Sequence, residues 1–176
     1  IILKIIFIFF LIYSPQIKAK EKWQLDKNLS TIKFELPVLF IKNVEGEFKE
    51  IDGYVELDSK NNNKAIFSVK IDSIEINYKK YKNLLLSNIF FDSLNFPIAV
   101  VDTMKFSYKN ENKLKLNVEL IIKDIAKIVP LNLEVFQLSQ DIVQIKGELI
   151  FSRKLFNIGK GKWSSGKILS DKAKIK

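Results

Sequence analysis

The chain has 176 residues, which is enough for one domain with a sizeable hydrophobic core. Hydrophobic residues make up 47% of it, including 14 phenylalanines, but it contains no cysteine and no histidine. These two absences exclude Ser-His-Asp and Cys-His nucleophilic sites, redox dithiols and nearly every zinc or haem site built from side chains. The composition therefore predicts a protein that binds rather than catalyses, with no cofactor and no metal.

The formal net charge is +9, and Arg153 is the only arginine among the 29 basic residues. Proteins that read nucleic acid rely on arginine for bidentate contacts with phosphate and guanine. Nucleic acid is therefore not an expected partner. Two interpretations of the lysines stay open: a solvated basic surface that follows from a lysine-rich composition, or a dedicated site for a polyanion.

Residues 1–19 are predicted to be a signal peptide. Lys4 precedes an apolar run over Ile5–Tyr13, and Ala19 supplies a small residue at a plausible cleavage point. A membrane-spanning helix needs about 20 apolar residues, so this shorter run fits a secretory segment better. A buried N-terminal helix and an uncleaved anchor are the alternatives. We therefore expect export to the periplasm, cleavage, and one mature domain over residues 20–176.

From Trp23 onward, apolar and polar residues alternate with a period of two. This pattern is typical of half-buried antiparallel strands. The alternating segments are Phe34–Leu36, Tyr54–Leu57, Phe67–Asp72, Leu114–Ile122, Leu131–Val135 and Val143–Phe151. Turn-like breaks separate them at Ser59–Lys64, Tyr108–Lys113 and Ser139–Asp141. Such short connections favour consecutive hairpins over crossovers through helices.

One segment departs from the strand pattern. Leucines and aromatic residues in Lys79–Ser93 fit a short helix and loop that pack over the sheet. Roughly eight strands with one such insertion predict a closed barrel, because closure removes the exposed edges of the strands. The expected fold class is all-β: an antiparallel, lipocalin-like barrel of about eight strands with one short helical insertion.

The inner face of such a barrel follows from the alternation of side chains. An eight-stranded barrel is just wide enough either to fill with its own side chains or to hold one slim ligand, and the residues alone leave both options open. If a ligand is held, the predicted binding residues are Phe34, Leu36, Phe67, Val69, Ile98, Val100, Phe106, Leu116, Val118, Leu120, Leu131, Leu133, Leu149 and Phe151. Asp102 also falls at an inward position, where a carboxylate needs a hydrogen bond or a bulge.

The order of several local patterns resembles the YceI-like family of exported lipid-binding proteins. The resemblance extends from Trp23 to Ile175. Its patterns are Trp23-Gln24-Leu25-Asp26, Val44-Glu45-Gly46-Glu47-Phe48, Asp72-Ser73-Ile74, Phe90-Phe91-Asp92 with Phe96-Pro97, Leu120-Ile121-Ile122-Lys123-Asp124, and Arg153, Phe156, Gly159 and Trp163 in the closing segment.

The resemblance implies a barrel whose apolar interior binds a long isoprenoid chain, such as a polyprenyl or quinone tail, to store, shield or carry it unchanged. The rival interpretation is a filled barrel whose basic exterior binds anionic membrane surfaces in the periplasm. Transient contact with a membrane surface is expected in either case. The oligomeric state stays open, with a homodimer among the options. Arg153 is expected to be a structural clamp at one end of the barrel or, alternatively, a ligand anchor.

Overall fold

The computed structural model describes residues 21–38, 43–58, 60–108 and 112–176, so the predicted signal peptide lies outside the described residues. The strands are β1 (Glu21–Gln24), β2 (Ile32–Leu36), β3 (Val44–Phe48), β4 (Ile51–Leu57), β5 (Lys64–Lys70), β6 (Ile74–Ile76), β7 (Ile98–Asp102), β8 (Lys113–Ile122), β9 (Ile125–Gln137), β10 (Val143–Ser152) and β11 (Lys172–Ile175). The helical elements are α1 (Lys82–Leu86) and the 3-10 turns η1 (Ile71–Ser73), η2 (Lys79–Tyr81), η3 (Arg153–Phe156) and η4 (Gly161–Ser164).

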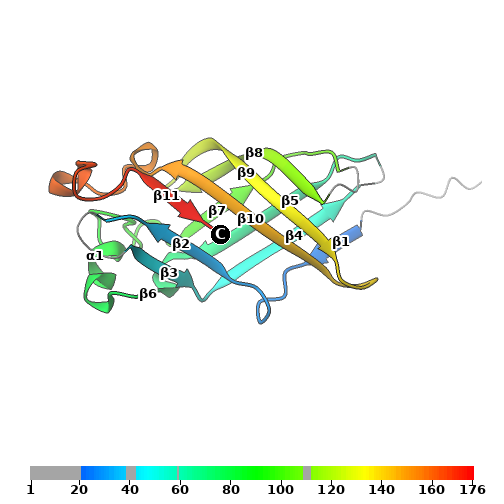
Figure 1. Cartoon of the computed structure of the whole chain (residues 1–176), viewed down its shortest axis with the longest axis horizontal. Helices are drawn as coiled ribbons and strands as arrows, with labels where there is room; N and C mark the ends of the chain where they lie inside the picture. Colours follow the sequence, from blue (N-terminus) through cyan, green and yellow to red (C-terminus); the bar gives the residue numbers. More distant parts are fainter. Residues whose placement is uncertain (1–20, 39–42, 59, 109–111) are drawn as a thin grey trace, which may run out of the picture.

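The strands form one antiparallel sheet in the order β1-β4-β5-β7-β8-β9-β10-β11-β2-β3-β6. Only Lys49 and Glu50 separate β3 from β4, so the sheet curls round until its two ends are joined by the chain itself. This arrangement confirms the predicted antiparallel barrel with one short helix (Figure 1).

Eleven strands appear where about eight were expected, because three long strands bend. The pairs β1 and β2, β3 and β4, and β5 and β6 each follow one another along the same path, and the register with the neighbouring pair shifts by two residues across each break. At one such bend the turn η1 inserts between β5 and β6. Bends of this kind let a strongly twisted sheet close on itself.

The barrel has two different ends. The helix end carries α1, η3 and η4, together with the β8–β9 turn at Lys123 and Asp124. The hairpin end carries the turns between β4 and β5, β7 and β8, and β9 and β10 (Figure 1). The β8–β9 turn has only two residues, both with positive φ (54° and 56°), as two-residue hairpins with the twist of their strands require.

One part of the wall lacks a hydrogen-bonded ladder. Strand β10 pairs with β11 only over Leu149–Ser152, so among the described residues its first half, Val143–Glu148, pairs with β9 alone. Strand β1 likewise pairs only with β4 within the described part of the chain. Following the sheet order round, these two free edges bound a seam in the half of the barrel that lies toward the hairpin end.

Candidate functional site

The side chains of the inner wall are buried in the half of the barrel that lies toward the helix end. On β8, Val118, Leu120 and Ile122 point inward and are 0%, 2% and 4% exposed. Their neighbours on the other strands are equally buried; these are Leu36, Val44, Phe48, Ile51, Val69, Val129, Leu131, Leu149 and Phe151. Together with Ile71, Ile74 and Phe156 they form the main hydrophobic core.

The inner wall changes character toward the hairpin end. On the same strand β8, Leu114 and Leu116 continue the inward alternation but are only half-buried. On one side of this level Ala65 and Asn63 are buried. Most other inward residues here are apolar and incompletely covered: Val55, Leu57, Phe67, Leu133, Val135, Val143 and Ile145. Ile145 is 39% exposed although it faces inward beside Val135.

This gradient divides the inner face into a closed floor and an upper half whose apolar side chains are only partly covered. A filled barrel would bury inward side chains along its whole length, because protein interiors leave few voids larger than a water molecule. Here the floor meets that standard, whereas water reaches the apolar wall above it. The arrangement suits a slim apolar guest better than a polar one, since the wall contributes chiefly hydrophobic contact.

The helix end is closed by a cap built around Arg153. Its guanidinium is 1% exposed and donates from Nε to Ser170 O (2.9 Å), from Nη1 to Ile158 O (2.7 Å) and from Nη2 to Leu169 O (3.1 Å). Burial lowers the pKa of Arg153, and the Asp171 carboxylate acts in the opposite direction. All three guanidinium nitrogens donate within the cap, so Arg153 acts as a structural clamp, the first of the two roles expected for it.

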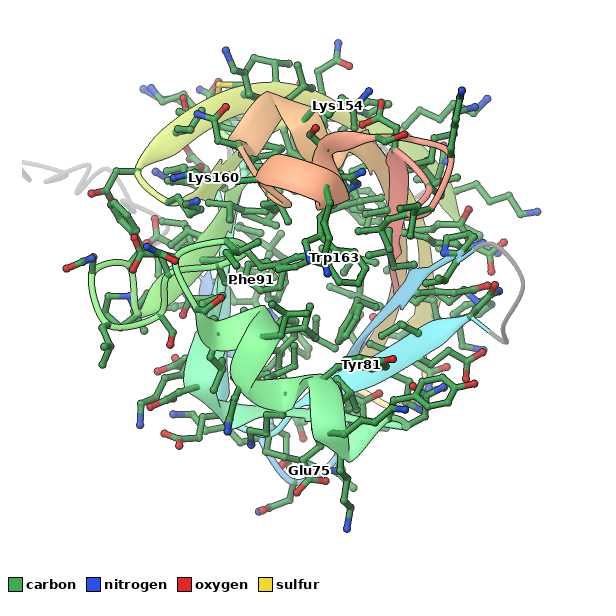
Figure 2. The ribbon with its side chains drawn as sticks, turned by 90° about the vertical axis from the view of Figure 1, so that its left-hand side faces the viewer. Glu75, Tyr81, Phe91, Lys154, Lys160 and Trp163 are labelled. Atoms are coloured by element: carbon green, nitrogen blue, oxygen red, sulfur yellow. The ribbon has the colours of Figure 1, made fainter. Side chains whose placement is uncertain are left out.

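Aromatic rings complete the cap. Trp163 from η4 lies at the end of the barrel, with Phe91 to its left and Tyr81 below it in the view of Figure 2. The Trp163 ring lies 5.8 Å from that of Phe90, and Phe151 meets Phe156 edge-on at 5.3 Å. These contacts join η3 and η4 to the segment that follows α1, so the helical insertion covers the sheet as predicted.

Glycines on the inner face have two distinct roles. At Gly46 an added Cβ would overlap the Phe34 ring and lie 2.6 Å from Glu75 O, so this glycine lets a ring cross the strand. At Gly147 the nearest atoms are methyl groups, 3.1 Å away on Leu133 and 3.5 Å away on Leu131. A methyl group at Gly147 would therefore press on the Leu133 side chain, which can move, whereas at Gly46 it would meet fixed backbone.

The structure brings most of the predicted site residues together on the inner face. Those in the closed floor are Leu36, Val69, Val118, Leu120, Leu131, Leu149 and Phe151. Those with partly accessible surface are Phe34, Phe67, Leu116 and Leu133. Phe106 is half-buried at the hairpin end, where it bridges to the buried, inward-facing Asn63.

The predicted orientation of strand β7 is wrong by one residue. Val101 lies opposite both Phe67 and Leu120, so Val101 and Ala99 face inward while Ile98 and Val100 face outward. Ile98 is accordingly 47% exposed. The run Ile98-Ala99-Val100-Val101 is apolar throughout, so its alternation carries no information about the inner face.

Asp102 belongs to the same correction, because it follows the outward alternation of β7. Its Oδ2 forms an ion pair with Lys64 Nζ at 2.9 Å, and its Oδ1 accepts a hydrogen bond from the Met104 backbone N–H. Sequence analysis also missed several inward positions, among them Ala99, Val101, Leu114 and Val135. For Leu114 and Val135 the signal was present, since each extends an alternating run by two residues.

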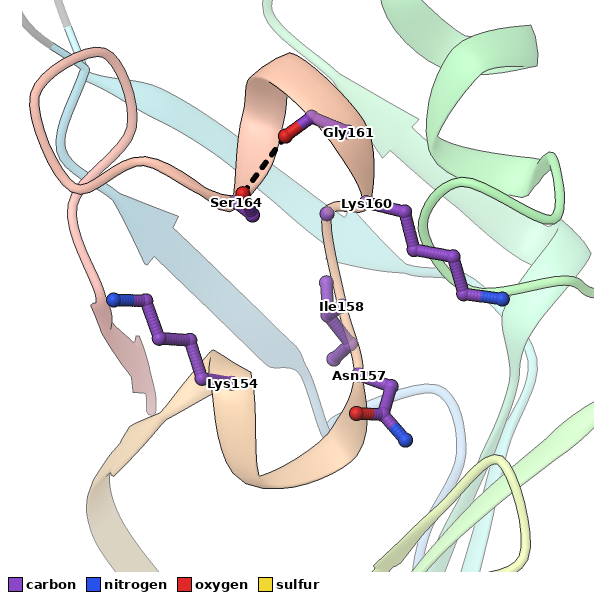
Figure 3. Close-up of a pocket in the computed structure, with 7 residues that line it drawn as sticks. Lys154, Asn157, Ile158, Lys160, Gly161 and Ser164 are labelled. Carbon is purple, nitrogen blue, oxygen red and sulfur yellow. Dashed lines mark hydrogen bonds between the residues drawn. The ribbon is translucent and has the colours of Figure 1, made fainter.

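A hollow lies on the outside of the cap. It has a volume of about 330 Å³ and is lined by Lys154, Asn157, Ile158, Gly159, Lys160, Gly161 and Ser164. Figure 3 shows the Lys154 and Lys160 side chains extending to opposite sides of it, so their charges do not converge on one point. The hollow therefore lacks the focused cluster of charges that a specific anion site requires.

Lys123 lies next to this hollow and is 8% exposed. Its Nζ donates to Asn157 O at 3.3 Å. Burial lowers the pKa of Lys123, nearby Lys160 lowers it further, and Asp92 acts in the opposite direction. The residue is a buried cation held by a carbonyl, and it sits outside the lumen.

The described ranges contain no group of three or more acidic side chains that could hold a metal ion. Within the same ranges, no helix is both long and apolar enough to cross a membrane.

The strand order and the apolar inner face define an antiparallel β-barrel. Residues 23–176 match the YceI-like domain, and the chain belongs to this family. None of the curated proteins matches the chain.

Solved structures of three bacterial proteins resemble the fold. BcnA of Burkholderia cenocepacia shares 24% identity and a TM-score of 0.77, over 85% of this chain and 94% of BcnA. A polyisoprenoid binding domain of Saccharophagus degradans, implicated in plant cell wall breakdown, has a TM-score of 0.69 at 10% identity, over 89% of this chain and 95% of that domain. The YceI protein of Campylobacter jejuni has a TM-score of 0.63 at 24% identity, over 85% and 91%.

Proposed function

We propose that the protein binds one long apolar chain, of the polyisoprenoid or quinone-tail class, non-covalently inside the barrel. The gradient along the inner wall carries this proposal: apolar residues that face inward on β8, β9 and β10 are half-buried toward the hairpin end and buried at the floor. Family membership and the description of the Saccharophagus degradans domain as polyisoprenoid binding support the ligand class.

The contacts would be hydrophobic and spread along the guest. Each CH₂ that leaves water contributes about 0.8 kcal/mol, so a chain lying against Leu114, Leu116, Leu133 and Val135 needs no polar anchor. The floor at Leu120 and Leu149 would then limit how far the chain enters. Selection would act on length and thickness more than on a headgroup, and the protein would store, shield or carry its guest unchanged.

Export belongs to the same proposal. A signal peptide at residues 1–19 would deliver the domain to the periplasm, where a water-insoluble chain needs a carrier between membranes. N-terminal sequencing of protein recovered from that compartment is expected to begin at or near Lys20. Finding residues 1–19 still attached in membrane fractions would contradict it.

Blocking the accessible half of the lumen tests the binding directly. Leu116→Trp places an indole on the inner face where water now reaches, so we expect retention of a fluorescent polyprenyl probe to fall about tenfold while thermal unfolding changes little. The matched control is Lys115→Trp, which places the same ring on the exposed outer face and should leave retention unchanged.

A third variant checks the floor. Val118 is 0% exposed, so Val118→Trp should overpack the core and cost roughly 1–3 kcal/mol of stability or more. If Leu116→Trp destabilises the protein as strongly as Val118→Trp, and the wild type never retains the probe, the barrel is filled. Salt-sensitive binding to anionic vesicles without probe uptake would then favour the rival function of a basic membrane-surface protein.

A further inference from the structure

The β9–β10 hairpin ends in a tip, defined here as residues 135–146, that extends past the neighbouring strand. Strand β8 begins at Lys113, which lies opposite Glu134, and Val135 N–H still donates to Asn112 O at 2.9 Å. Beyond that bond, β9 pairs only with β10 among the described residues. Leu138 N–H donates to Ile142 O at 2.9 Å and closes the turn. Within the described part of the chain, the hairpin tip is therefore two-stranded.

The hairpin tip carries apolar side chains on both of its faces, beside the exposed polar turn residues Ser139, Gln140 and Asp141. Leu138 and Ile142, next to the turn, are 61% and 52% exposed. On the opposite face, Val135 and Ile145 lie side by side, and Ile145 is 39% exposed. Exposed large apolar side chains that cluster at one projecting point mark a surface that another phase or partner covers.

A row of lysines stands behind the apolar residues. Lys146 lies opposite Glu134, which lies opposite Lys113, and Lys115 follows on the next outward position of β8. Only one carboxylate stands among these three lysines; Glu134 pairs with Lys113 at 3.4 Å, while Lys146 lies over the Phe136 ring at 5.2 Å. We call Lys113, Lys115 and Lys146 the lysine collar. Exposed apolar side chains next to such basic residues are the arrangement that interfacial membrane segments share.

The free edge of the barrel connects this tip to the lumen. Val143 and Ile145 belong to the half of β10 that no strand covers on its second side within the described residues. Their inward side chains continue to Gly147 and Leu149, and so to the floor. The alternate, inward-facing residues of β10 thus form an apolar path from the exposed tip into the barrel.

We propose that the hairpin tip docks on a lipid bilayer, with Leu138 and Ile142 inserted at the interface and the lysine collar against lipid phosphates. A second copy of the chain fits less well, because strand pairing would cover the backbone edge of β10 but leave these two outward side chains in water. The docking itself does not depend on the proposed function. Only the purpose of docking rests on it, which is to place the barrel interior where an apolar chain leaves the membrane.

Vesicle flotation tests the docking without any ligand. The probe is vesicles of phosphatidylcholine and phosphatidylglycerol, and the variant is Leu138→Asp with Ile142→Asp. We expect the partition coefficient to fall about 100-fold, roughly a factor of ten for each side chain withdrawn from the interface. The matched control is Leu94→Asp, an equally drastic change at a 96% exposed leucine in the loop between α1 and β7, which should leave partitioning within about twofold.

Two further readouts keep this test separate from that of the lumen. The chain has no cysteine, so a polarity-sensitive dye on Leu138→Cys reports insertion directly, and its emission should shift to shorter wavelength on adding vesicles. The double variant should still retain the polyprenyl probe in solution. Wild-type protein that stays unbound to vesicles would overturn the proposal, and so would a double variant that floats like the wild type or a wild-type dimer that the double variant dissociates.

Discussion

Removing the Arg153 guanidinium should nearly unfold the protein, because the cap has no other group that can satisfy the same carbonyls. Arg153→Met keeps most of the side-chain length but deletes the donors to Ile158 O, Leu169 O and Ser170 O. Breaking a buried, fully bonded charge in this way costs about 3–5 kcal/mol, which is a large part of the 5–15 kcal/mol that holds a domain of this kind together.

Asp171 adds to that cost. Its Oδ2 accepts a hydrogen bond from Ser152, whereas its buried Oδ1 has no hydrogen-bond partner among the described residues. The positive charge of Arg153 interacts favourably with this carboxylate, so the methionine variant would leave the partly buried Asp171 without that counter-charge. The stability of Arg153→Lys should fall between those of the wild type and Arg153→Met, since one ammonium cannot reach three divergent carbonyls.

Urea unfolding followed by tryptophan fluorescence measures these differences, because Trp163 lies in the same cap. Lys154→Met is the matched control: the same change at the next residue, whose side chain is exposed, should shift stability by less than about 0.5 kcal/mol. If Arg153→Met unfolds within about 1 kcal/mol of the wild type, the clamp contributes little and the reasoning is refuted.

Two further changes test the glycines and the buried lysine. Gly46→Ala should cost about 2–3 kcal/mol of stability or more, since the backbone oxygen of Glu75 blocks the added methyl. Gly147→Ala should cost under about 1 kcal/mol, because only a leucine methyl must move. Equal losses of stability in urea unfolding would contradict this contrast. Lys123→Met should raise stability on the order of 1 kcal/mol near neutral pH. Because the folded-state pKa of Lys123 lies below its ordinary value of 10.5, the wild type should gain stability as pH rises from the folded-state pKa through 10.5, and the variant should lose that slope in unfolding measured at alkaline pH.

The sequence by itself determined the class of fold and the chemistry of the wall. Alternation over Leu114–Ile122 and Val143–Phe151 is a local property of the chain, so it reports strand type and apolar face before any strand finds its partner. For Arg153 the sequence left two roles open, a clamp at one end of the barrel or a ligand anchor, and its three carbonyl partners come from the tertiary structure.

Only the tertiary structure decided which parts of that wall are covered. Leu116 and Val118 are neighbours on one face of one strand, yet the first is half-buried and the second fully buried, because the cap closes one end of the barrel and β10 is uncovered toward the other. The direction of Val100 was likewise settled by its register against β8. Both depend on pairings between residues far apart in the chain, and a periodic pattern within one strand carries no information about them.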